Sequence, residues 1–166
     1  MTQALQPILY SYDPEQEAVW VDATPFRAHV DQLLATGLTE SVLARLAGVS
    51  VRVVTHLAHG RRGRPVRRIC GDTARRLLRI TTLEAKTLRF RPVPVRASRY
   101  RLRTMADAGW SERQLADEIG LGIRDVQQIL GQGSATCAQL SALKIAVAYE
   151  QWETDQEFPG LYAAVA

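Results

Sequence analysis

One stretch of the chain occurs twice, at an offset of 72 residues. Residues 37–57, GLTESVLARLAGVSVRVVTHL, align without a gap on residues 109–129, GWSERQLADEIGLGIRDVQQI. Similarity at a fixed offset is typical of a duplicated structural unit, so we expect two copies of one small fold. The identical pairs include Gly37 and Gly109, Glu40 and Glu112, Leu43 and Leu115, Ala44 and Ala116, Gly48 and Gly120, Arg52 and Arg124, and Val54 and Val126.

Both copies carry the marks of short helices. Apolar residues recur every three or four positions, and Ser, Thr, Pro and Gly stand where helices begin and end. The first copy predicts helices over 24–36, 40–47, 51–59 and from Asp72 onward, with N-caps at Thr24, Thr39, Ser50 and Asp72. The second copy predicts helices from Ser98 to about Ala108, after the N-cap Ser111, over 123–130, and, introduced by Ser134, over 138–152.

The segment between the copies is predicted to be a connector. Pro92 and Pro94 each push the preceding residue out of the α region, so residues 89–97 are expected to be extended. The predicted fold class is therefore all-α, with two small helical bundles joined by an extended, basic, proline-containing linker. Its parts are an N-terminal arm (1–23), a first domain (24–88), the linker (89–97), a second domain (98–153) and a C-terminal tail (154–166).

Positive charge is concentrated in the middle of the chain. The overall net charge is only +4, yet residues 61–103 hold fourteen arginines and Lys86 against two acidic residues, a net charge of +13. Residues 1–60 carry a net charge of −3 and residues 104–166 carry −6. A segment this basic favours an anionic partner, and phosphate is the obvious one because its neutralisation releases condensed counterions. A solvated basic linker is the alternative.

The repeated segment places small residues where two crossed helices need them. Ala44 and Ala116 allow a second helix to pack closely, and Gly48 and Gly120 can take the positive φ of a tight turn. This pattern resembles the helix-turn-helix of the lambda-repressor and Cro-like families. The tandem arrangement, the opening WVDATPFRAHVDQLLATG and the loop GRRGRPVRR also resemble small regulators of actinobacteria and their phages, including phage immunity repressors. The resemblance implies that both bundles are helix-turn-helix domains.

The same resemblance implies that the second helix of each pair enters the major groove and meets base edges with its N-terminal residues. Arg52 can then bind guanine O6 and N7, and Val51 suits a thymine methyl group. Gln127 or Gln128 suits adenine N6 and N7. The expected DNA contacts are Ser50, Val51, Arg52, Thr55 and His56 in the first recognition helix and Ile123, Arg124, Gln127 and Gln128 in the second.

Arginines outside these helices are further candidates for contact with DNA. The loop contains Arg-Gly-Arg-Pro at 62–65, which resembles the core of an AT-hook, an extended segment whose arginines enter the narrow minor groove. Minor-groove insertion, phosphate contact and a loop without a role in binding remain open. The loop candidates are Arg61, Arg62, Arg64, Arg67 and Arg68, and the candidates for backbone contact are Arg99, Arg101 and Arg103.

Acidic residues flank the second copy, and Asp125 lies inside its recognition helix. Because carboxylates oppose a phosphate backbone, this copy is expected either to bind DNA weakly or to serve protein contact.

Other chemistry finds little support in the sequence. There is neither a glycine-rich phosphate loop after a strand nor a recognisable nucleophile constellation, so we expect neither an enzyme nor a cofactor. His56, His59 and Cys70 lack a fourth ligand for a metal site. Two cysteines are too few for a disulfide framework. Without an 18-residue apolar run or a secretory signal, the sequence predicts a cytoplasmic, nucleoid-associated protein with no membrane partner.

The leading hypothesis is a sequence-specific regulator of transcription, most simply a repressor, that binds double-stranded DNA through two tandem units. Two heads on one chain would let a monomer bind a non-palindromic site, and a short tether would raise the effective concentration of the second contact. One alternative is a DNA-architectural or recombination accessory factor, such as an excisionase-like protein. The other is an adaptor whose acidic C-terminal unit binds a protein partner or a second copy.

Overall fold

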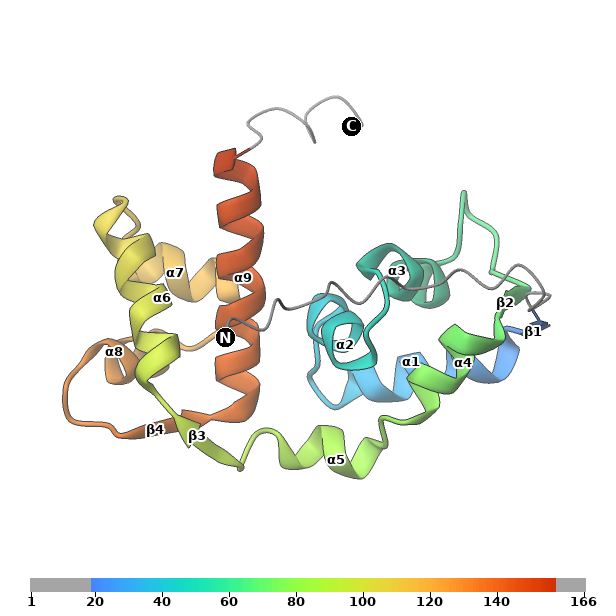
Figure 1. Cartoon of the computed structure of the whole chain (residues 1–166), viewed down its shortest axis with the longest axis horizontal. Helices are drawn as coiled ribbons and strands as arrows, with labels where there is room; N and C mark the ends of the chain where they lie inside the picture. The colour runs from blue at the N-terminus through green and yellow to red at the C-terminus, as the bar shows by residue number, and fades with distance from the viewer. Residues whose placement is uncertain (1–18, 158–166) are drawn as a thin grey trace, which may run out of the picture.

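The computed structural model describes residues 19–157, which are mostly helical with two short β-ladders (Figure 1). The expectation of a largely helical protein is confirmed. In this range no helix combines the length and the apolar character that crossing a bilayer requires. The elements are β1 (Trp20–Asp22), α1 (Thr24–Ala35), α2 (Glu40–Ala47), α3 (Val51–His59), β2 (Arg68–Cys70), α4 (Gly71–Leu78), α5 (Thr82–Thr87), β3 (Pro92–Pro94), α6 (Arg96–Asp107), α7 (Glu112–Ile119), α8 (Ile123–Leu130), β4 (Thr136–Ala138) and α9 (Gln139–Glu157).

The elements form two units with the same order of strands and helices. Unit 1 runs from β1 to α4, and unit 2 runs from β3 to α9. The first four elements of unit 2 start 72 residues after their counterparts, whereas β4 and α9 start 68 residues after β2 and α4. In each unit the strand before the first helix pairs antiparallel with the strand before the last, Val21 opposite Ile69 and Val93 opposite Cys137. The duplication therefore extends well beyond the stretch that the sequence repeat covers.

The segment 89–97 is more than a connector. It is extended over Pro92–Pro94, as expected, but there it forms β3 and pairs with β4. Prolines, which have no N–H group, fit this strand because a two-stranded ladder leaves one edge of each strand unpaired. Val95 is 3% exposed, and α6 begins at Arg96 rather than at Ser98, whose side chain is buried. Residues 92–97, two thirds of the predicted linker, thus belong to the body of unit 2.

The first helix also begins differently from the sequence expectation. Its N-cap is Ala23 instead of Thr24, and the Thr24 backbone N–H donates to the Asp22 carboxylate at 2.8 Å. This hydrogen bond lowers the pKa of Asp22 below its ordinary value. Residues 20–22, assigned from sequence to an N-terminal arm, are therefore part of unit 1. Asp72 is not a cap either: it lies in the first turn of α4, 2.7 Å from Nε of Arg76.

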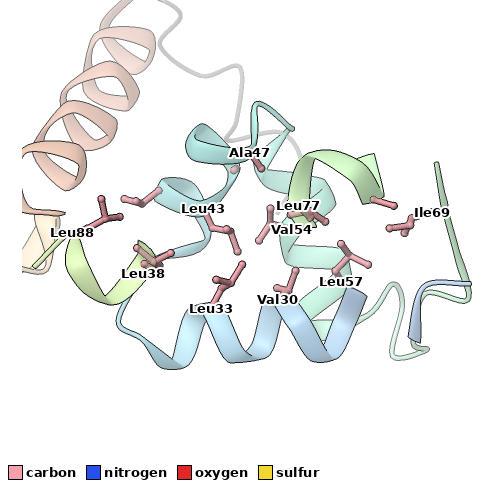
Figure 2. Close-up of a cluster of buried hydrophobic side chains, with 14 of the residues drawn as sticks. Val30, Leu33, Leu38, Leu43, Ala47, Val54, Leu57, Ile69, Leu77 and Leu88 are labelled. Atoms are coloured by element: carbon pink, nitrogen blue, oxygen red, sulfur yellow. The ribbon is translucent and has the colours of Figure 1, made fainter. Parts of the chain in front are cut away.

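Each unit has its own hydrophobic core. In unit 1 the four helices contribute one leucine each, all of them 2% exposed or less: Leu33, Leu43, Leu57 and Leu77 (Figure 2). The equivalent positions of unit 2 hold Met105, Leu115, Ile129 and Ile145, which are buried to a similar degree. Burial of each such side chain contributes about 1.5–3 kcal/mol. Equivalent positions thus form the hydrophobic core of each unit.

The turn between the second and third helices has one geometry in both units. Gly48 and Gly120 have φ values of +65° and +66°, in the left-handed region that glycine reaches without steric strain. Their carbonyl oxygens each accept a hydrogen bond of 2.9 Å from the fourth helix, from Arg76 Nη1 and from Lys144 Nζ. The predicted role of both glycines is confirmed, and a bond that the repeat did not reveal fixes each turn.

Helix α9 belongs to both cores. Leu143 and Val147 pack against the core of unit 1, whereas Ile145 and Trp152 pack against the core of unit 2. Figure 1 shows α9 standing between the other helices of unit 2 and the helices of unit 1. Its 19 residues compare with 8 in the equivalent helix α4. The sequence predicted two units joined by a short tether. Because α9 packs into both cores, the two units instead share one helix.

Candidate nucleic-acid interface

The third helix of each unit leaves one face uncovered. At the start of α3, Ser50 and Arg52 are exposed and Val51 is 45% exposed. Val51 corresponds to Ile123 at the start of α8, which is 41% exposed. The duplication therefore preserves an uncovered apolar side chain at the same place. The remaining residues predicted to read bases from α8 are exposed as well: Arg124, Gln127 and Gln128.

Residues in the middle of both helices are held by the preceding helix. The half-buried Thr55 hydroxyl donates to the carboxylate of Glu40, and His59 Nε2 lies 2.5 Å from the other oxygen of that carboxylate. In unit 2 the Gln127 amide donates to Glu112 at 2.8 Å. Thr55 and Gln127 were both predicted to contact DNA, and each already donates to an acidic residue of the preceding helix. The matched glutamates of the repeat are the only sequence signal of this bond.

His56 is half-buried at the boundary between α3 and the arginine-rich loop. It lines a groove of about 240 Å³ together with Trp20, Arg61 and Arg68. Trp20 is 56% exposed there.

The arginine-rich loop is a tight hairpin. Arg61 and Arg64 bond to each other through both backbone N–H groups, at 2.8 and 3.1 Å. The two residues between them, Arg62 and Gly63, have φ values of +51° and +73°, as in the type I′ turns of two-residue hairpins. The extended conformation of an AT-hook, which the sequence suggested, is therefore wrong for this segment. The turn places Arg62 at its tip.

All five candidate arginines of this hairpin are exposed. Arg67 and Arg68 lie at its base, where they line a shallow groove with Arg27 and Asp22. Within residues 19–157 none of the five forms an ion pair, so their charge is available to an external anion. We call residues 61–68 the basic hairpin.

Two of the three arginines of α6 that were predicted to bind the DNA backbone donate to carbonyl oxygens within unit 2. Arg99 is half-buried, and its Nε and Nη2 donate to the carbonyl oxygens of Ile129 and Ser134 at 2.8 and 2.7 Å. Arg103 donates to the Leu130 carbonyl at 3.3 Å. Cations at a helix C-terminus satisfy unpaired carbonyls and the helix dipole. These two residues therefore hold the end of α8, and Arg101 is half-buried.

The outer surface of unit 2 is more acidic than that of unit 1. Asp117 and Glu118 are exposed on α7, and Asp125 is exposed on α8, close to Arg124 in sequence. These charges oppose phosphate around the second exposed helix. The two units thus share a fold but differ in electrostatics.

No family model matches the chain, and neither a characterised protein nor a solved structure matches it.

Proposed function

We propose that the chain binds double-stranded DNA in a sequence-specific manner through two helix-turn-helix pairs, α2–α3 and α7–α8, and acts as a transcriptional repressor. The observation that carries the proposal is a glycine-turned helix pair, present twice, whose second helix is exposed at its N-terminal end. Next to the first of these helices lies the basic hairpin, whose arginines are free of ion pairs within the described residues.

Unit 1 is the principal reading head in this proposal. Val51 and Arg52 are exposed at the start of α3, where a recognition helix meets base edges. In this proposal Arg52 binds guanine O6 and N7, and Val51 packs on a thymine methyl group. Thr55 contributes less to base reading, because its hydroxyl already donates to Glu40.

The basic hairpin increases the affinity for DNA but does not recognise particular bases. A two-residue turn with Arg62 at its tip is narrow, and side chains of Arg61 and Arg64 flank it. Such a projection suits the minor groove beside the site or the phosphates along it, and both contacts gain from counterion release.

Unit 2 is the weaker head. Arg124 and Gln128 are exposed and suited to guanine and adenine, but Asp125 opposes the backbone nearby. Since α9 packs into both cores, the two heads meet DNA as one body, which favours a single asymmetric site. When the protein occupies such a site over a promoter, it represses transcription because it blocks access to that promoter.

The test is selection from a random DNA pool followed by binding measurements on the selected site. Arg52→Ala should reduce discrimination at one base pair by about 1–3 kcal/mol. Arg62→Ala should weaken binding to all sequences and reduce the salt slope by about 1. Arg79→Ala is the matched control, since Arg79 is exposed at the end of α4, outside both helix pairs and the basic hairpin. If no preferred sequence emerges from the pool, the proposed function is wrong.

The acidic surface of unit 2 favours a second candidate, an adaptor that binds a cationic protein partner through α7 and α8. Charge reversal of Asp117 and Glu118 to Lys would then abolish partner capture, whereas a unit 2 that binds DNA should bind it more tightly after the same change.

A further inference from the structure

Helix α9 continues past the point at which its counterpart ends. α4 ends at Leu78, which corresponds to position 146 of α9, so residues 147–157 have no equivalent in unit 1. We call this extension the acidic strap. It contains no Lys or Arg and carries four carboxylates: Glu150, Glu153, Asp155 and Glu157.

One face of the acidic strap packs on unit 2, through Tyr149 and Trp152. The other face lies against unit 1. Glu150 and Thr154, one helical turn apart, line a groove of about 390 Å³ whose other wall includes Ser50 and Val51 at the start of α3. The carboxylate-rich end of α9 thus stands beside the very residues that the proposed function directs into the major groove.

A single ion pair joins the acidic strap to the helix pair of unit 1. The Arg45 guanidinium on α2 donates to the Glu150 carboxylate, and this contact raises the pKa of Arg45. The two side chains are 39% and 51% exposed. Exposed pairs of this kind are weak, because water and salt screen them and two long side chains must be ordered. The contact can therefore open when a stronger anion arrives.

We propose that the acidic strap is an autoinhibitory element: Glu150 holds Arg45, a cation beside the recognition helix, and DNA must displace that carboxylate to bind unit 1. This inference rests on the proposed function. Phosphate and Glu150 compete for the same guanidinium, and the neighbouring carboxylates of the strap repel the approaching backbone. Unit 1 consequently binds DNA less tightly than its own surface allows, and release of the strap increases the number of phosphates neutralised by about one.

The experiment measures the affinity of the full chain for its selected DNA site as a function of salt. Glu150→Gln should bind about fivefold more tightly near physiological salt and steepen the slope of log K against log salt by about 0.9, the effect of one added phosphate contact. In the double variant Arg45→Gln with Glu150→Gln, most of this gain should disappear. Asp31→Asn is the matched control, because it removes one exposed carboxylate from α1 of unit 1, away from the acidic strap in sequence.

Two results would overturn the autoinhibitory role. One is a Glu150→Gln chain that binds no better than Asp31→Asn, and the other is a gain that survives the loss of Arg45. Thermal unfolding of each variant checks that its fold is intact. A wild-type chain with no sequence preference refutes the proposed function itself. If the wild-type chain selects a site but Glu150→Gln and Asp31→Asn bind it with equal affinity, only the autoinhibitory role of the acidic strap is refuted.

Discussion

Replacement of Gly48 by Ala measures how much of the molecule's stability depends on the turn between α2 and α3. Its φ of +65° lies in the left-handed region, where an L side chain raises the energy by about 1–2 kcal/mol. Space is not the limiting factor, because a Cβ would meet only the Arg76 guanidinium, at 3.5 Å, which is ordinary contact. We therefore expect Gly48→Ala to lower the free energy of unfolding by about 1–2 kcal/mol and Tm by about 2–4 °C per kcal/mol.

Urea unfolding followed by circular dichroism provides the measurement. Gly133→Ala is the matched control, since Gly133 lacks a left-handed φ and a Cβ there would meet nothing within 4 Å. Gly48→Asn should lose less than Gly48→Ala, because Asn tolerates the left-handed region. Equal stabilities of the Ala variants at 48 and 133 would refute the argument from backbone strain. Gly120→Ala should match Gly48→Ala, as the duplication requires.

Three further predictions concern the contacts that hold the units. Arg99→Met should lower the free energy of unfolding by about 1–3 kcal/mol, because two half-buried carbonyls lose their donor, and hydrogen exchange in α8 should accelerate; unchanged exchange would contradict this role. Leu77→Ala, at a fully buried position, should lose about 2–5 kcal/mol in urea unfolding, whereas a loss below 1 kcal/mol would mean that the core of unit 1 is not packed as described. The pKa of Glu84 is lowered by the hydrogen bonds from the Thr81 backbone N–H and hydroxyl. A lowered folded-state pKa stabilises the protein above the unfolded-state pKa, and this stabilisation is lost as pH falls through the folded value. An NMR titration should therefore place the Glu84 midpoint below 4.5, the ordinary value, and a midpoint at or above it would rule out the capping box.

Local chemistry was enough to predict the second and third helices of each unit. Thr39 and Ser111 accept hydrogen bonds from backbone N–H groups three residues ahead, and the glycine turns depend only on φ, so the sequence nearby determines them. The first helices were misplaced because Ala23 and Val95 make no side-chain cap. Their positions depend on distant backbone, through N–H bonds to the carbonyls of residues 67 and 135. Three-residue strands are also too short to show alternation.

For the candidate site, the sequence predicted which side chains are exposed, but not which groups they bond to. Helical phase alone places Arg52 and Arg124 outward, and both are exposed. Arg99 has the same charge and the same apparent exposure in sequence, yet its partners are carbonyls 30 and 35 residues away. No pattern of residue types distinguishes an arginine that is free for phosphate from one that caps a distant helix. The turn at Arg62 was missed because Arg-Gly-Arg-Pro is compatible with both an extended and a turned backbone.

The sharing of α9 has a consequence for biosynthesis. Leu140 contributes to the core of unit 1, and its N–H donates to the Leu88 carbonyl at 2.9 Å, although some fifty residues of unit 2 are translated in between. Domains of nascent chains usually fold in order from the N-terminus. Here the half that leaves the ribosome first waits, with part of its apolar interior open to water, for α9 to be made, and the two halves reach their final state together.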